Sequence, residues 1–195
     1  MNYSGLDDFL SRGAKTALAK GPVALVFIED HAEIASTLAH TRKCGFRELV
    51  VFTPDGVTLP AAEAETAHAI RYDTQAEGSV TRAVNAVIAV APQTTWFYYC
   101  FNTEYLFYPF CETRTVREMI AFHTEERRDA MLSYVIDLYA EDLNRFPDAV
   151  CPSEAMLDKS GYYALARKDA ARAFEPKDRQ LDYFGGLRWR FEEHI

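Results

Sequence analysis

The sequence predicts an α/β fold, in which a mostly parallel sheet is flanked by helices. Two unbroken apolar runs, at residues 23–28 and 49–52, are typical of strands buried on both faces of a parallel sheet. A third run, at residues 96–101, is rich in the aromatic residues that strands favour. Helical patterns separate these runs, and an alternation of strand and helix is the signature of this fold class.

The helices are predicted from apolar spacing and from the residues that end them. Residues 6–19 predict a leading helix, which Gly21-Pro22 separates from the first strand. Residues 31–43 carry apolar positions at helical spacing, and Gly45 follows as a C-terminal cap. Residues 79–91 begin with a capping serine and stop before a proline, which predicts another helix.

The remaining segments give weaker signals. Residues 67–72 form a strand candidate, and residues 115–128 are helical by pattern. Residues 133–139 are rich in β-branched and aromatic residues, which favours a strand, although their spacing also fits a continued helix. The last run, 184–191, begins like a strand, and the chain stops at Ile195 without a cap or polar tail. We therefore expect the natural chain to extend further.

Composition excludes several classes of protein. The 195 residues are 49% hydrophobic, enough for one sizeable core, and the net charge of −8 comes without a basic patch for nucleic acid. No apolar run approaches the roughly 20 residues that span a bilayer. The polar first residues are not a secretory signal, and the four scattered cysteines predict reduced thiols. We expect a cytoplasmic protein; the oligomeric state stays open.

Polar residues follow three of the predicted strands. Glu29-Asp30 comes after the first, residues 53–56 (Thr-Pro-Asp-Gly) after the second, and residues 102–104 (Asn-Thr-Glu) after the third. Ligands of open α/β sheets bind beyond the carboxyl ends of the strands. Carboxylates gathered there can hold a hard divalent cation, which in turn neutralises a diphosphate. Exposed, polar strand ends are also ordinary in this fold class, so both interpretations stay open.

Four segments together resemble family 2-like glycosyltransferases of a bacterial branch. They read VALVFIEDHAEIASTLAHTRKCGFRELVVF (23–52), WFYYCFNTEYLFYP (96–109), DKSGYY (158–163) and FGGLRWRFEEH (184–194). The second segment resembles the family's DxDEFL block, and the last its GGLRWR close. The resemblance implies a GT-A-like, Rossmann-like single domain over residues 1–195. It also implies a nucleotide-sugar-binding half at 1–110 and a less regular acceptor-side half at 111–195.

The resemblance implies a donor site and a reaction. A sugar would pass from a nucleotide-sugar, most simply a UDP-sugar, to an acceptor that the sequence leaves unknown. The residues at matching donor-binding positions are Asp30, Thr53, Asp55, Asn102, Gly185, Gly186 and Arg188. Glu104 matches a metal-binding position, and the metal would be Mn²⁺ or Mg²⁺. No residue is identified as the catalytic base.

The sequence departs from the family at the metal motif. Aligned on Glu104, the two aspartates of the DxD become Phe101 and Thr103. Phenylalanine cannot ligate a cation and threonine offers only a neutral hydroxyl, so we expect a weakened metal site. The proline beside Asp55 also stiffens the loop in which the family carries a nucleotide-binding aspartate.

Two alternatives follow from these departures. The first is a non-catalytic relative that keeps the fold as a binding or interaction module. The second is a signalling receiver domain, which the acidic pair Glu29-Asp30 and the placement of Asp73 resemble. Against a receiver, no lysine is well placed near residue 110 and the chain is too long.

Overall fold

The computed structural model describes residues 1–133, 135–157, 168–169, 173 and 175–176. The chain forms two compact units, Met1–Asp129 and Ala130–Ile195. The expected boundary between two halves near residue 110 falls inside the first unit. Gly185, Gly186 and Arg188 lie outside the described residues.

The first unit is built on a parallel five-stranded sheet. Its strands are β1 (Asn2–Tyr3), β2 (Val23–Phe27), β3 (Glu48–Thr53), β4 (His68–Arg71) and β5 (Phe97–Phe101). They lie in the order β1-β4-β3-β2-β5, and every pairing is parallel. The predicted α/β fold class with a parallel, Rossmann-like sheet is therefore confirmed.

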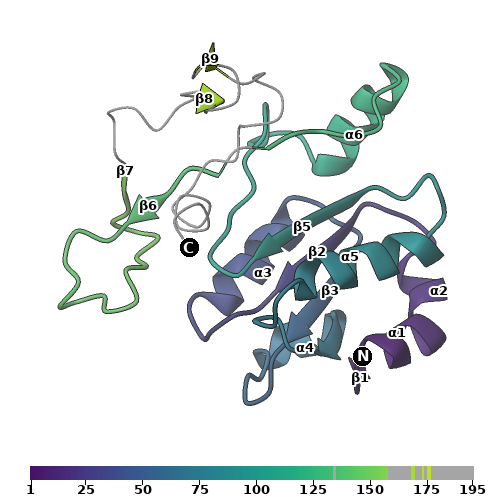
Figure 1. The fold of residues 1–195 in the computed structure, drawn as a ribbon, viewed down its shortest axis with the longest axis horizontal. Coiled ribbons are helices and arrows are strands. Elements are labelled where there is room, and N and C mark those ends of the chain that lie inside the picture. Colours follow the sequence, from purple (N-terminus) through teal and green to yellow (C-terminus); the bar gives the residue numbers. More distant parts are fainter. Residues whose placement is uncertain (134, 158–167, 170–172, 174, 177–195) are drawn as a thin grey trace. The chain divides into compact units, whose positions relative to one another are not determined.

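Helices cover both faces of the sheet (Figure 1). One face packs against α1 (Leu6–Arg12), α2 (Ala14–Ala17) and α5 (Ser79–Val90). The other packs against α3 (Ile34–Lys43), α4 (Ala61–Thr66) and the start of α6 (Val116–Glu125). Two hydrophobic cores result, one on each side of the sheet.

Strand β2 shows why its sequence is continuously apolar. Alternate side chains of a strand point to opposite faces. Ala24 and Val26 accordingly lie in the core beneath α3, whereas Val23, Leu25 and Phe27 lie in the core beneath α5. All five residues are fully buried. A central strand with helices on both faces has no solvent-facing side, so an unbroken apolar run is what it requires.

The connections place a reversal of strand order between β2 and β5. From β2 the chain passes through α3 to β3 and through α4 to β4, moving in one direction across the sheet. Helix α5 then leads back to β5 on the opposite side of β2. The order β4-β3-β2-β5 corresponds to 3-2-1-4 of the Rossmann sheet, and ligands bind in that fold where the order reverses.

Most predicted elements of the first unit are confirmed, and two are new. The helix expected at 6–19 is broken at Gly13, which separates α1 from α2. Strand β1 and helix α4 were not predicted, since β1 has only two residues and α4 has no fully buried residue. Gly45, expected as a cap, has a φ of +92°, and it follows the last turn of α3.

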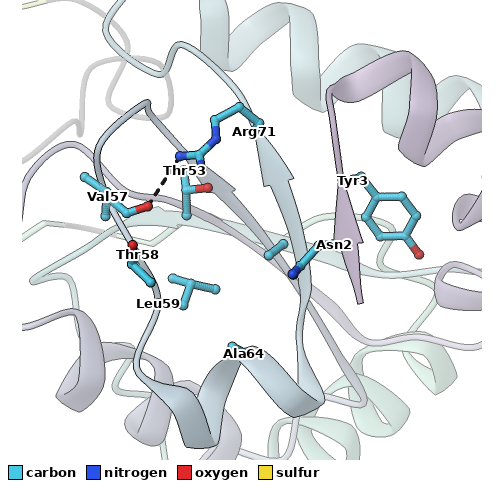
Figure 2. Close-up of a pocket in the computed structure, with 9 residues that line it drawn as sticks. Asn2, Tyr3, Thr53, Val57, Thr58, Leu59, Ala64 and Arg71 are labelled. Carbon is cyan, nitrogen blue, oxygen red and sulfur yellow. Dashed lines mark hydrogen bonds between the residues drawn. The ribbon is translucent and has the colours of Figure 1, made fainter.

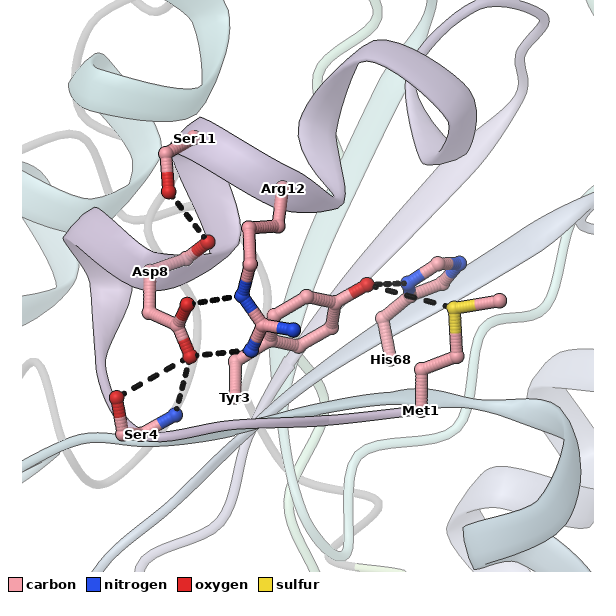
Figure 3. Close-up of polar contacts among 7 residues, drawn as sticks. All are labelled: Met1, Tyr3, Ser4, Asp8, Ser11, Arg12 and His68. Carbon is pink, nitrogen blue, oxygen red and sulfur yellow. Dashed lines mark hydrogen bonds and ion pairs between the residues drawn. The ribbon is translucent and has the colours of Figure 1, made fainter.

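The short strand β1 is held by a polar network that is buried at Tyr3 and His68 (Figure 3). The Tyr3 hydroxyl lies 3.0 Å from Nδ1 of His68, and the two rings are stacked with centroids 5.8 Å apart. Nε2 of His68 lies 3.7 Å from the Glu48 carboxylate. The Arg12 guanidinium lies over the Tyr3 ring and pairs with Asp8. These contacts attach the first residues of the chain to β4.

The described residues of the second unit contain only short strands. β6 (Leu138–Tyr139) pairs antiparallel with β7 (Met156–Leu157), and β8 (Lys168–Asp169) pairs with β9 (Glu175–Pro176). Among the described residues of the strand expected at 133–139, Leu138–Tyr139 alone lie in a ladder, paired with β7. In the part of the chain that the structure describes, no helix is long and apolar enough to cross a membrane.

Candidate functional site

The candidate site is the carboxyl edge of the sheet at the reversal of strand order. Here β2 ends at Phe27 and β5 ends at Phe101, in parallel register with each other. The loop from β2 into α3 and the loop after β5 therefore emerge side by side. Both loops carry residues that the sequence had singled out, Asp30 in the first and residues 102–104 in the second.

Asn102 joins the two loops. Its side chain is 4% exposed and lies beside the end of β2. Oδ1 of Asn102 accepts the Glu29 N–H at 2.9 Å. Its Nδ2 donates to Asp30 Oδ1 at 2.7 Å and to the Ala32 carbonyl at 2.9 Å. Because both the oxygen and the nitrogen of this buried amide are hydrogen-bonded, Asn102 fixes the loop between β2 and α3, called the β2 loop below, relative to β5.

Asp30 is exposed, but one of its carboxylate oxygens is hydrogen-bonded within the site. Besides Asn102, Oδ1 of Asp30 accepts the Ala32 N–H at 2.8 Å, an arrangement common to aspartates in turns. Asp30 and Asn102 were both expected in the donor site, and the structure brings them into direct contact. Asp30 is thus held in a fixed orientation at the carboxyl ends of β2 and β5.

The same loop is held from the β4 side. Thr74 Oγ1 donates to the Ile28 carbonyl at 2.6 Å, and Gln75 Nε2 donates to the Glu29 carbonyl at 3.0 Å. Thr74 is buried, and its own carbonyl accepts the Ser79 hydroxyl at the start of α5. Residues after β4 and β5 therefore clamp the β2 loop between them.

The positions that resemble the metal motif have structural roles. The Glu104 carboxylate accepts the Phe101 N–H at 2.8 Å, within the loop after β5. Thr103 adopts a φ of +66°, and its N–H donates to the buried Thr37 hydroxyl of α3. Phe101 packs against the core, with its ring 6.2 Å from that of Phe27. These contacts shape the loop after β5 and anchor it to α3.

Thr53 and Asp55 follow the neighbouring strand β3. Thr53 is buried, and its hydroxyl donates to the Ile70 carbonyl of β4 at 3.2 Å. The Asp55 side chain is almost entirely exposed and lies 3.3 Å from Nε of Arg71. The structure therefore directs Asp55 toward β4, whereas Asp30 lies toward β5. The two carboxylates belong to different parts of the edge.

A second polar cluster, at the start of α3 and in the loop after β5, was not predicted. Glu33, just before α3, has a φ of +49°, and its carboxylate accepts the Ser36 hydroxyl. The Ser36 oxygen lies 2.8 Å from the Tyr105 hydroxyl of the loop after β5. His40 Nε2 lies 2.9 Å from the Leu106 carbonyl in the same loop. The left-handed backbone of Glu33 has no marker in sequence, so only the structure could reveal this cluster.

Burial alters the titration of two side chains of β5. Burial raises the pKa of the Cys100 thiol to about 12, and the nearby charge of Glu104 adds to the effect. Burial likewise raises the pKa of Tyr98, with smaller contributions from Cys100 and Glu104. Cys100 is therefore a neutral thiol at physiological pH and behaves as a core residue rather than as a nucleophile.

Within the described residues, no three His, Cys, Asp or Glu side chains are grouped closely enough to hold a metal ion.

The residues that the resemblance implied for the donor site divide into three sets. Asp30 and Asn102 meet, Thr53 and Asp55 lie on the neighbouring strand, and the Gly185-Gly186 and Arg188 positions lie outside the described residues.

No family model, curated protein or solved structure matches the chain.

Proposed function

We propose that the chain is a glycosyltransferase-type domain that binds a nucleotide-sugar at the reversal of strand order. The observation that carries this proposal is the contact of Asp30 with Asn102 at the carboxyl ends of β2 and β5. In sheets of this kind, this is the place where ligands bind. The resemblance of residues 23–52 and 96–109 to family 2-like glycosyltransferases supports the choice of ligand.

Asp30 is the described residue that best fits a divalent cation. It is exposed, and Mg²⁺ in enzymes is commonly bound by one or two carboxylates together with the substrate's own phosphate oxygens. Mn²⁺ or Mg²⁺ bound in this way would neutralise the charge of the leaving diphosphate. Asn102 orients the Asp30 carboxylate, and the hydrogen bonds to the loop between β2 and α3 keep that carboxylate at the ends of β2 and β5.

Calorimetric titration with UDP, with and without Mn²⁺, tests the proposal. We expect binding that requires Mn²⁺ and weakens at least tenfold in Asp30→Asn, since a neutral amide oxygen is a weaker ligand for a divalent cation than a charged carboxylate. Glu125→Gln, on the exposed end of α6, makes the same change in charge and is the control. Absence of UDP binding in the natural protein, or equal binding in Asp30→Asn, would contradict the proposal.

A second candidate is a non-catalytic domain that binds the nucleotide-sugar without transferring the sugar. The observation that favours it is that the metal-motif positions have structural roles. Phe101 packs against the core, and the Glu104 carboxylate accepts a backbone N–H. Assays for hydrolysis of and transfer from UDP-sugars separate the two candidates. Turnover that is lost in Asp30→Asn supports the enzyme, whereas binding without turnover supports the second candidate.

A further inference from the structure

The two edges of the parallel sheet differ in how they are protected. At one edge, β1 consists of only Asn2 and Tyr3, whose side chains point to opposite sides of the strand (Figure 2). Very short edge strands are one way in which proteins prevent sheets from pairing edge to edge. At the other edge lies β5, a strand of five residues that, among the described residues, pairs with β2 alone.

The register with β2 determines which backbone groups of β5 point outward. The Val23 N–H donates to the Trp96 carbonyl at 2.9 Å. Because bonded residues alternate along a parallel ladder, every second residue of β5, counted from Trp96, bonds to β2. The N–H and C=O groups of the residues between them, Phe97, Tyr99 and Phe101, therefore point away from β2.

The loop after β5 closes one end of this edge. The Phe101 N–H donates to the Glu104 carboxylate at 2.8 Å, and the Phe101 carbonyl accepts the Glu104 N–H at 3.4 Å. Within the described part of the chain, the outward groups of Phe97 and Tyr99 have no such partner. Residues 97–99 are therefore the open edge of the sheet.

The open edge is aromatic and carries no charge. The Tyr99 side chain is 57% exposed, and residues 91–103 include no charged side chain. Natural edge strands are commonly protected by lysine or proline, and residues 97–101 contain neither. An edge of this kind is a template on which another extended strand can pair.

We infer that the open edge pairs with the same edge of a second copy of the chain. A two-fold axis perpendicular to the sheet makes the two β5 strands antiparallel. In an antiparallel ladder, two opposed residues whose backbone groups face each other exchange both N–H···O bonds. Phe97 of each copy opposite Tyr99 of the other therefore brings every outward group of these two residues into a hydrogen bond.

The side chains in this register also match. Phe97 packs in the core beneath α5, and Tyr99 shares that face because alternate residues of a strand point the same way. Each Phe97 ring then lies beside a Tyr99 ring of the other copy, and such aromatic pairs stabilise neighbouring strands. No like charges meet, since residue 95 lies opposite residue 101 and none between them is charged. The edge is complementary to itself, which favours a second copy as the occupant.

The size of the contact determines the strength of the dimer. A stable, specific dimer buries about 800 Å² on each partner. Pairing along a strand of five residues buries less, so the dimer is reversible and forms at high micromolar concentration. The antiparallel arrangement directs the carboxyl ends of the two sheets in opposite directions, so this inference does not depend on the proposed function.

Sedimentation of the full chain over low to high micromolar concentrations tests the inference. Salt at about 0.15 M screens the repulsion between copies that each carry a net charge of −8. We expect a monomer–dimer equilibrium. Hydrogen exchange followed by magnetic resonance tests the register, because the Phe97 and Tyr99 amides should become protected as the concentration rises.

Two variants act on the open edge itself. Tyr99→Pro removes the outward N–H and leaves the ladder with β2 intact, as proline does on edge strands. We expect it to weaken the dimer at least tenfold, because both hydrogen bonds donated by the Tyr99 N–H groups are lost. Tyr99→Lys, which keeps that N–H and places a charge at the edge, should have a similar effect and decides the matter if the proline variant fails to fold. Ala62→Lys, at an exposed position of α4, is the control and leaves the dimer unchanged.

Each outcome either supports or overturns the inference. A dimer that the folded Tyr99 variants weaken and Ala62→Lys retains supports it. A monomer at every concentration overturns it, as do growth beyond a dimer, a dimer that the Tyr99 variants leave unchanged, and a dimer without protection of the two amides. Titration with UDP is independent of these results, so failure of the dimer leaves the proposed function intact, and failure of UDP to bind leaves the open edge intact.

Discussion

Asn102 donates a 2.7 Å hydrogen bond to Asp30, and this contact joins the ends of two parallel strands, β5 and β2, that are about 70 residues apart in the chain. The same amide accepts the Glu29 N–H. Asn102 therefore holds the two loops of the candidate site in position, although Asn102 itself is nearly inaccessible to a ligand.

Replacing Asn102 with alanine is expected to destabilise the protein. The change leaves the Glu29 N–H and the Ala32 carbonyl without their buried partner, at a cost of about 2 kcal/mol in the free energy of unfolding. Denaturant unfolding measures this. Asn85→Ala, on the exposed face of α5, is the control and should change stability by less than about 0.5 kcal/mol. Similar values for the two variants would contradict the role of Asn102.

Gly13 is expected to be intolerant of a side chain. A Cβ there would lie 2.3 Å from the Tyr3 hydroxyl oxygen and 2.5 Å from the adjacent ring carbon. Because His68 and Arg12 hold the Tyr3 ring, the ring cannot yield freely, and Gly13→Ala should cost about 2 kcal/mol of unfolding free energy. Gly5→Ala meets nothing within 4 Å and has an extended φ, so its thermal unfolding should match that of the natural protein.

His68 is expected to make stability depend on pH. Burial lowers its pKa and the terminal ammonium adds to this, although Glu48 acts in the opposite direction. A histidine with a lowered pKa favours the folded state when neutral, so its contribution is present above the ordinary pKa of about 6.5. The contribution is lost as the pH falls from there through the lower folded value. Unfolding curves between pH 8 and pH 5 measure this loss.

The control for His68 uses a second histidine. His68→Gln should remove the pH dependence in this window, whereas His31→Gln, at an exposed position, should preserve it. The carboxylates with lowered pKa values, Asp8 and Glu118, titrate at more acidic pH and stay charged throughout the window. An unchanged slope in His68→Gln would show that another group is responsible.

Thr115 is expected to stabilise α6 through its capping box. Its hydroxyl accepts the Glu118 N–H, and the Glu118 carboxylate accepts the Thr115 N–H at 2.8 Å. Thr115→Ala should lower the unfolding free energy by about 1 kcal/mol. The Thr115 backbone and Arg114 also lower the Glu118 pKa to about 2, and loss of the hydroxyl should raise that pKa in a carboxyl titration by magnetic resonance. Thr124→Ala, on the exposed last turn, is the control.

The sequence was informative where hydrophobic burial determines structure. Residues 23–28 and 49–52 are fully buried, and their apolar character alone predicted β2 and β3. Strand β1 was missed because two residues make no pattern, and its attachment depends on Tyr3 meeting His68, which is 65 residues distant. Such a contact follows from the folded topology and leaves no local signal.

The candidate site was only partly predictable for a related reason. The rule that strand ends gather at one edge placed Asp30 and Asn102 together. This rule could not show that the Glu104 carboxylate accepts the Phe101 N–H, or that Asp55 lies beside Arg71, because these contacts depend on loop conformation. The left-handed backbone at Thr103 likewise requires a neighbouring helix, α3, to hold it.

The clamping of the β2 loop bears on how fast and how selectively a ligand can associate. Gln75 and Thr74 hold the loop on one flank and Asn102 on the other. A ligand arriving at this edge meets a surface whose shape is set beforehand, so little conformational entropy is lost on association. Free and bound forms should then be nearly superimposable at this edge, with association limited by encounter rather than by rearrangement.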